Sequence, residues 1–369
     1  MRFFTQIPTG HSDVIHDTAF DFHGKRLATC SSDQVVEVWD QSEGGEWSLT
    51  GRWKAHAASI WKVAWAHPEF GQVLATCSFD HHVIIWGEPE RRLAPSSPRD
   101  PASASRSSDR GSAGEAGASS EAGNEGGAGK SRSAGGVGDD DGPGGWNKYA
   151  SLVDARESVN DIEFAPRHHG LRLAATSAKG IVRIYEASDV TNLNSWSVAE
   201  TIDDAGDGAG NALAWNPSRF ASPSMVTGGN GSAPLIYQFS DSSNRWVCVE
   251  RLEGHEDAIH DVAWAPNMGR RFELIASGSK DGSVRLWRLE QGSFASSPIA
   301  TFDQHHSQVW RVKWNITGTV LASSGDDGLV RLWKRDFMDE WRLLSEISGD
   351  KGEAIPQSSA VAAATSSAQ

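Results

Sequence analysis

The feature that most constrains the fold of this chain is a pair of spacings that recurs four times. In four segments, a His lies nine residues before a Phe or a Trp. These pairs are His11 and Phe20, His56 and Trp65, His255 and Trp264, and His305 and Trp314. Further along each segment, an Asp lies six residues before a Trp. These pairs are Asp33 and Trp39, Asp80 and Trp86, Asp281 and Trp287, and Asp327 and Trp333. Because both spacings occur together in all four segments, they indicate an internal repeat, and an internal repeat strongly constrains the fold.

Each repeat has the pattern of paired β-strands. In the segment VWRVKWNITGTVLASSGDDGLVRLWK, residues 309–334, two stretches of alternating apolar and polar residues flank a Gly-Asp-Asp-Gly turn. Alternation with a period of two is typical of a half-buried strand. Two further units keep the strands but change the marker residues. The third has Lys179 in place of the Asp and Tyr185 in place of the Trp, and the fourth ends at Tyr237 with neither His nor Asp. The chain therefore contains six repeats.

This pattern is typical of WD repeats, each of which forms one four-stranded blade of a β-propeller. We predict an all-β fold, a six-bladed propeller over residues 1–347. Within a blade, the recurring His, Asp and Trp are predicted to form a buried hydrogen-bonded network with a strand hydroxyl group, because buried polar groups need partners. The network residues are His11, Asp33, Trp39, His56, Asp80, Trp86, His255, Asp281, Trp287, His305, Asp327 and Trp333.

A catalytic dyad or a metal site is the alternative reading of these His and Asp residues. Their recurrence once per blade, at matched positions, favours the structural role. The third and fourth blades lack these His and Asp residues, and we expect them to be the least rigid part of the ring. No Gly-x-Ser-x-Gly motif, phosphate-binding Gly-rich loop or zinc-ligand spacing occurs in the sequence. We therefore expect no enzymatic activity, no cofactor and no metal site.

Composition narrows the choice of partners and compartment. The formal net charge is −14 and no basic stripe is present, which argues against direct binding of nucleic acid. The three cysteines, Cys30, Cys77 and Cys248, form no C-x-x-C pair and make no disulfide framework. The sequence has no apolar run long enough to span a membrane and no signal-peptide core at its start. We expect a reducing compartment, the cytosol or the nucleus.

Two segments are predicted to be disordered. Residues 88–145, between the second and third repeats, are rich in Gly, Ser and Ala and almost free of large apolar residues. Such a segment buries too little surface to offset the entropy lost on ordering. A surface insertion is favoured over a phosphorylated regulatory loop. The tail, residues 348–369, has a similar composition.

Counting strands predicts that the ring is open between the sixth and first blades. The sixth repeat ends with its own outer strand, residues 340–347, yet an additional strand is expected at residues 2–7. Unpaired sheet edges tend to pair with another chain, which gains backbone hydrogen bonds and apolar burial. The residues predicted to bind a partner are Arg2, Phe3, Phe4, Thr5, Gln6 and Ile7 at one edge, and Trp341, Leu343, Leu344 and Ile347 at the other. The alternative is that the aromatic residues among them are ordinary core of these two blades.

Several stretches resemble one family of WD-repeat proteins. FDFHGKRLATCSSDQVVEVWD, WAHPEFGQVLATCSFD, GIVRIYEASDVTNLNSWS and VWRVKWNITGTVLASSGDDGLVRLWK are similar to the Sec-thirteen-homologue type of WD-repeat nucleoporin. The resemblance covers about residues 3–347. The AHPEFGQVLA and WNITGTVLASSGDDG segments carry it most specifically, because blade packing does not demand them. Residues 88–145 and 205–239 carry little of it.

The resemblance implies a scaffold subunit of the Y-shaped complex of the nuclear pore, at the nuclear envelope. In that family an open six-bladed propeller is completed by a blade that an α-helical solenoid nucleoporin inserts, and the hetero-oligomer supports transport of protein and mRNA. The resemblance also implies a place in a coat-like complex that regulates TOR signalling at the lysosome or vacuole.

A peptide-reading adaptor, such as a ubiquitin-ligase substrate receptor, is the alternative function. Such receptors often carry Trp-Asp-x-Arg at the end of a blade. Here Trp39 and Asp40 are followed by Gln41 and Ser42, so the Arg of that motif is missing.

Overall fold

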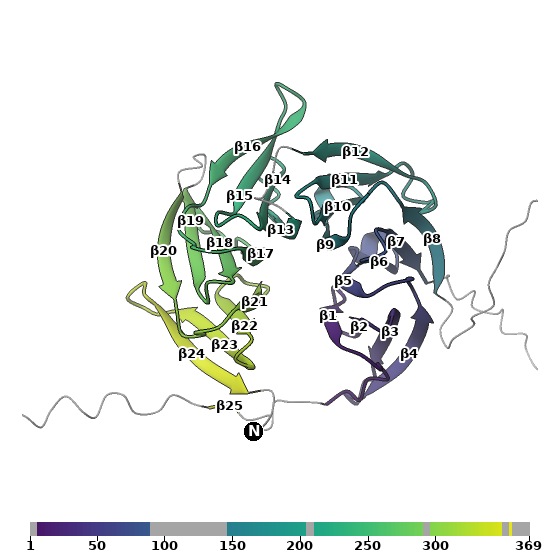
Figure 1. Ribbon diagram of the computed structural model, residues 1–369, viewed down its shortest axis with the longest axis horizontal. Coiled ribbons are helices and arrows are strands. Elements are labelled where there is room, and N and C mark those ends of the chain that lie inside the picture. Colours follow the sequence, from purple (N-terminus) through teal and green to yellow (C-terminus); the bar gives the residue numbers. More distant parts are fainter. Residues whose placement is uncertain (1–5, 89–145, 204–209, 291–295, 349–353, 356–369) are drawn as a thin grey trace, which may run out of the picture. The chain divides into compact units, whose positions relative to one another are not determined.

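The computed structural model describes residues 6–88, 146–203, 210–290, 296–348 and 354–355. These residues form six antiparallel sheets, arranged as the blades of a propeller ring within one compact unit (Figure 1). No helix of the described residues is long and apolar enough to cross a membrane.

Each blade is built from four strands that follow one another in the chain. Blade one contains β1 (Ile15–Phe20), β2 (Arg26–Ser31), β3 (Val35–Gln41) and β4 (Trp47–Lys54). Blade two contains β5 (Ile60–Trp65), β6 (Val73–Ser78), β7 (Val83–Gly87) and β8 (Asn147–Leu152), and blade three contains β9 (Val159–Phe164), β10 (Arg172–Ser177), β11 (Val182–Ala187) and β12 (Trp196–Ile202). Short 3₁₀ helices, η1 (Pro68–Phe70) and η2 (Arg167–His169), follow the first strands of blades two and three.

The second half of the ring repeats this order. Blade four contains β13 (Gly210–Trp215), β14 (Ser224–Gly229), β15 (Leu235–Ser240) and β16 (Arg245–Arg251). Blade five contains β17 (Ile259–Trp264), β18 (Phe272–Ser279), β19 (Val284–Glu290) and β20 (Ser296–Phe302). Blade six contains β21 (Val309–Trp314), β22 (Val320–Gly325), β23 (Leu329–Arg335) and β24 (Trp341–Ser348), and a two-residue strand, β25 (Ala354–Ile355), pairs with the outer side of β24.

The six predicted blades are confirmed. The outer strand expected at residues 340–347 is β24. The segment predicted to be a disordered tail, residues 348–369, contributes the short strand β25 to the same sheet. A strand was expected at residues 2–7. Gln6 and Ile7 do not form a strand, and the other four residues of this segment lie outside the described part. The predicted insertion, apart from Glu88, also lies outside the described residues.

The turn between the second and third strands explains why the repeat keeps its polar residues. In blade one, Asp33 accepts a hydrogen bond from the backbone N–H of Val35 at 3.0 Å. The residue after the turn Asp, or after Lys179 in blade three, adopts a positive φ in five blades. These residues are Gln34, His81, Gly180, Gly282 and Gly328. Left-handed backbone costs a glycine little, so three of the five repeats have Gly at this position.

The core consists of apolar clusters that lie between neighbouring blades. Five such clusters occur among the described residues, one at each junction from blades one and two to blades five and six. Cys30 and Cys77 lie in two of these clusters and are fully buried, whereas Cys248 is exposed. No cluster of described residues joins blade six to blade one. Six blades in a closed ring would need six such junctions, so this one differs from the others.

Candidate functional site: the junction between blades six and one

The inner strand of blade one exposes a side chain that the other blades bury. Four other blades place an Ile or a Val at the position equivalent to Ile15, and all of them are at most 1% exposed. They are Ile60, Val159, Ile259 and Val309. Ile15 is 37% exposed. Since these side chains are all β-branched and occupy the same strand position, the difference indicates that blade six does not pack against β1 as the other blades pack against the next inner strand.

The aromatic residue that ends the inner strand shows the same difference. Three blades use the Nε1–H of a Trp here to donate to a carbonyl oxygen of the preceding inner strand. Trp65 donates to Ala19 at 3.0 Å, Trp215 to Glu163 at 3.2 Å and Trp314 to Ala263 at 3.1 Å. In blade one the residue is Phe20, which is 59% exposed and pairs with Trp47 of its own blade. A Phe side chain has no N–H group to donate, so blade one lacks this hydrogen bond to the preceding blade.

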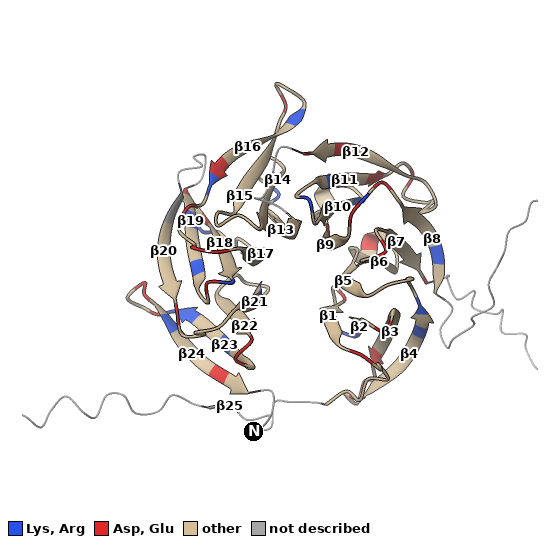
Figure 2. Ribbon diagram, in the orientation of Figure 1, with Lys and Arg blue, Asp and Glu red and all other residues tan. Residues whose placement is uncertain are grey.

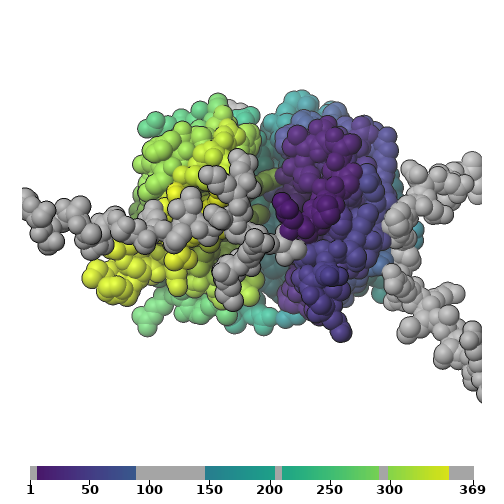
Figure 3. Space-filling model, turned by 90° about the horizontal axis from the view of Figure 1, so that it is seen from below, coloured from purple at the N-terminus to yellow at the C-terminus, as the bar shows by residue number. Residues whose placement is uncertain are grey.

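The facing side of blade six is also uncovered. At the start of its third strand, Val330 is 36% exposed, whereas the equivalent Val residues of four blades are at most 1% exposed. These are Val36, Val83, Val182 and Val284. Ile347 pairs with Val330 across β23 and β24 and so shares its face, and Leu344, left unpaired at a bulge in β24, is exposed. Figure 3 shows the surfaces of blade one and blade six facing each other across an indentation.

Among the described residues, the polar contacts between these two blades come from one side chain. Arg311 of β21 donates from Nη2 to the carbonyl oxygen of His16 at 3.4 Å, and lies 3.9 Å from Asp17 Oδ1. By contrast, each inner strand from β1 to β17 packs extensively against the inner strand of the next blade, and β21 and β1 do not. The junction is therefore bridged by one charged side chain rather than by a core.

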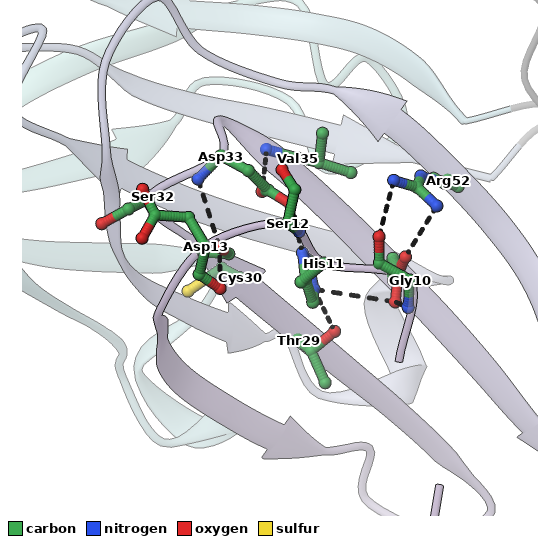
Figure 4. A network of polar contacts seen from close by, with 12 residues as sticks. Gly10, His11, Ser12, Asp13, Thr29, Cys30, Ser32, Asp33, Val35 and Arg52 are labelled. Carbon is green, nitrogen blue, oxygen red and sulfur yellow. Dashed lines mark hydrogen bonds and ion pairs between the residues drawn. The ribbon is translucent and has the colours of Figure 1, made fainter. Parts of the chain in front are cut away.

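The segment that enters β1 is fixed to blade one by a polar network (Figure 4). His11 contacts Asp33 Oδ2 through Nδ1 at 3.0 Å and Thr29 Oγ1 through Nε2 at 2.8 Å. Gly10 donates to Glu37 Oε2 at 3.2 Å, and the guanidinium of Arg52 lies 3.3 Å from Glu37 Oε1. These contacts hold residues 10–12 against blade one, beside the open junction.

The predicted network is complete in blades two, five and six. In blade two, His56 contacts Asp80 at 2.9 Å and Thr76 Oγ1 at 2.7 Å, and Trp86 donates to the same hydroxyl at 3.0 Å. The same three contacts join His255, Asp281, Ser277 and Trp287 in blade five, and His305, Asp327, Ser323 and Trp333 in blade six. In blade one the indole N–H of Trp39 has no partner among the described residues.

These contacts affect ionisation as well as geometry. Partial burial opposes ionisation of Asp80, but the hydrogen bond from His56 and those from backbone N–H groups hold its pKa well below the ordinary value. The carboxyl of Asp281 is depressed in the same way, with His255 and Ser283 as donors, so that its pKa is also low. Both carboxylates are therefore ionised at neutral pH and act as fixed acceptors within their blades. The described residues contain no group of three or more His, Cys, Asp or Glu placed to hold a metal ion.

Comparison with known proteins identifies the relatives of the chain. The WD domain, G-beta repeat family model matches residues 3–40, 47–87, 246–288 and 296–334. Nucleoporin SEH1 of Homo sapiens is 42% identical over 363 residues, which cover 93% of this chain and 88% of that protein. Nucleoporin SEH1 of Xenopus tropicalis is 42% identical over 361 residues with the same coverage, and that of Danio rerio is 41% identical over 379 residues, 98% of this chain and 91% of that protein. The chain belongs to the SEH1 nucleoporin family.

The residues predicted to bind a partner of this SEH1 family member do not all lie at the open junction. Trp341 and Leu343 pack toward the cluster between blades five and six, on the side away from the open junction. Leu344 is exposed and Ile347 shares the face of Val330. Of the N-terminal set, Gln6 is exposed and Ile7 is half-buried, and Arg2, Phe3, Phe4 and Thr5 lie outside the described residues.

The sequence prediction did not name Ile15, Phe20, Val330 or Arg311 as junction residues. Aligning the six repeats would have found the three apolar ones, since each sits at a position that is apolar in most blades. In this chain, these three residues are exposed at the junction between blades six and one. The WD-repeat matches fall on blades one, two, five and six, which are the blades that carry the His and Asp pair.

Proposed function

We propose that this protein is a non-enzymatic scaffold subunit of the Y-shaped complex of the nuclear pore, and that an α-helical solenoid nucleoporin binds it by inserting a blade between blades six and one. Membership of the SEH1 nucleoporin family supports the scaffold role. The observation that carries the binding mode is the presence of five interblade clusters for six blades among the described residues.

An inserted blade would bury the apolar side chains that flank the junction. Ile15 and Phe20 lie on one side, and Val330, Leu344 and Ile347 lie on the other. Complete burial of one such side chain stabilises by about 1.5–3 kcal/mol relative to full exposure. The inserted blade would also occupy the place where β21 and β1 lack a packed neighbour.

The charge distribution agrees with a protein partner. Figure 2 shows Lys and Arg scattered over the described strands and interrupted by Asp and Glu, without a continuous basic track. The net charge of the chain is −14. Since phosphate backbones are bound by clustered positive charge, the surface supports a partner that is not a nucleic acid.

The test is affinity purification of a chain tagged at its C-terminus, with three variants run beside it. Ile15→Asp and Val330→Asp place a charge on the two faces of the junction. Val247→Asp is the matched control, because Val247 is 43% exposed on the outer strand of blade four. Helical solenoid nucleoporins are expected to copurify with the intact chain and the control, and to be depleted from both junction variants.

The other outcomes are equally informative. Equal recovery with all four chains would contradict insertion at this junction. A deletion of residues 2–7 tests separately whether the N-terminal segment contributes to binding. Recovery of subunits of a coat-like TOR-regulating complex would support the second assembly that the resemblance implies. Recovery of ubiquitin-ligase subunits instead would support the peptide-reading alternative.

A further inference from the structure

One residue of each inner strand is left unpaired where a bulge interrupts its pairing with the second strand. In order around the ring, the residues at this bulge position are His16, Trp61, Asn160, Asn211, His260 and Trp310. The first five are partly buried. Trp310 of blade six is 44% exposed. Blade six, which borders the open junction, therefore differs from the other blades at this position.

The bulge position contacts the next blade around the ring. Asn160 of blade three donates from Nδ2 to the carbonyl oxygen of Gly210 in blade four at 2.7 Å. The ring centroid of His16 in blade one lies 4.4 Å from that of Trp61 in blade two. Trp61 in turn packs against the apolar cluster between blades two and three. These side chains are thus covered by the blade that follows them.

Trp310 and Trp61 have corresponding neighbours on their other sides. Like Trp61, Trp310 lies beside a His ring of the preceding blade, with 4.2 Å between its ring centroid and that of His260. Each Trp also contacts the residue that precedes the turn Asp of its own blade. For Trp61 this is Phe79, with 5.0 Å between ring centroids. For Trp310 it is Asp326, which accepts the indole N–H at 2.5 Å. The exposure of Trp310 therefore reflects the open junction on its remaining side.

The identity of the bulge residue is related to the residue that begins the next inner strand. Three bulge residues carry a ring and are followed by another blade, and in each case the next inner strand begins with Ile or Val. The pairs are His16 and Ile60, Trp61 and Val159, and His260 and Val309. Each of these Ile and Val side chains is at most 1% exposed. A ring at the bulge thus accompanies a buried β-branched residue in the blade that follows.

We infer that Trp310 is the aromatic anchor of blade six for the inserted blade, and that the inner strand of the inserted blade begins with Ile or Val beside this indole. The inference rests on the proposed blade insertion and adds the contact residue and the chemistry of the partner strand. A Trp at the centre of an interface commonly carries a large share of the binding energy. His260 and Asp326 already orient the indole, so little side-chain freedom is lost when the partner covers it.

The first test measures the affinity of the purified chain for the solenoid nucleoporin that copurifies with it. Trp310→Ala is expected to weaken binding at least about 30-fold, the change that corresponds to the lower limit for a hot-spot residue. Trp310→Phe keeps the ring and should retain most of the affinity. Phe220→Ala is the matched control, because Phe220 is an aromatic residue that is 93% exposed on blade four. The control should bind like the intact chain.

Hydroxyl-radical footprinting of the intact chain, read by mass spectrometry, keeps the test decisive if Trp310→Ala fails to fold. In the free chain Trp310 should be oxidised faster than Trp61, and saturating partner should protect Trp310. Met268, which is 73% exposed on blade five, should be oxidised equally with and without the partner. On the partner side, replacing the first residue of the inner strand of the inserted blade by Asp should weaken binding by a factor similar to that of Trp310→Ala.

Two results would overturn the inference while leaving the scaffold role standing. One is binding of Trp310→Ala within about twofold of the intact chain. The other is a bound complex in which Trp310 is oxidised as fast as in the free chain. If the intact chain binds no solenoid nucleoporin, the proposed function fails and the inference fails with it.

Discussion

Replacing Ile15 or Ile60 by alanine removes the same atoms from equivalent positions of blades one and two, so the pair measures whether the ring is open. Ile60 is 0% exposed and lies in the cluster between those blades. Removing three buried carbon atoms costs about 2.4 kcal/mol in transfer free energy, and the cavity that remains raises the total to about 3–4 kcal/mol.

The same change at Ile15 should cost less. Ile15 is 37% exposed, so folding removes only part of its side chain from water and the alanine variant loses only that part of the transfer free energy. Scaling by the buried fraction gives about 1.5 kcal/mol, and no closed cavity forms on a surface open to water. We expect Ile60→Ala to lower the free energy of unfolding by about 2 kcal/mol more than Ile15→Ala does.

Urea denaturation of the purified chain gives this difference as a shift in midpoint at constant slope. The affinity for the solenoid partner should show the opposite order, because in the proposed complex only Ile15 faces the inserted blade. Equal losses of stability for the two variants would mean that Ile15 is buried in the free protein. The ring would then be closed, and the reasoning from the missing sixth cluster would be refuted.

Three further predictions concern the blades themselves. Thr76→Val should lower the free energy of unfolding by about 1–3 kcal/mol, because the hydroxyl of Thr76 hydrogen-bonds both His56 and the buried indole of Trp86. Thr176→Val is the control, since the buried hydroxyl of Thr176 has no partner among the described residues. The advantage of Asp80 over Asn at that position should be full at pH 7 and should shrink as the pH falls below about 3.8, because the depressed pKa of Asp80 stabilises the folded state only while the carboxyl is ionised. Burial raises the pKa of Glu163 from 4.5 to about 7, so the fold loses stability as the pH rises through that range, and Glu163→Gln should gain on the intact chain between pH 5 and pH 8 in thermal unfolding.

The blades and their internal networks could be predicted because their signals are local. His56, Asp80 and Trp86 lie within one repeat, and their spacing follows from the strands and turns that connect them. Counting strands also led to the prediction of an opening between the sixth and first blades. That argument relied on an additional strand at residues 2–7, and the two described residues of that segment, Gln6 and Ile7, are not in a strand.

The residues that line the junction could not be predicted in the same way. Trp341 and Leu343 belong to the outer strand of blade six, but they face blade five. A bulge in β24 shifts the register beside Leu344, so alternation along the sequence does not reveal which face a residue takes. Ile15 and Val330 have the same residue types as their buried equivalents. Only their place in the ring distinguishes them.

Amide hydrogen exchange of the intact chain, with and without the purified solenoid nucleoporin, tests the central claim most directly. The account predicts that the partner slows exchange in β1 of blade one and in β21 to β24 of blade six, while blades three and four are unchanged. Slowed exchange in blades three and four with no change at β1 and β21 would contradict the account, because the partner would then bind a different part of the ring.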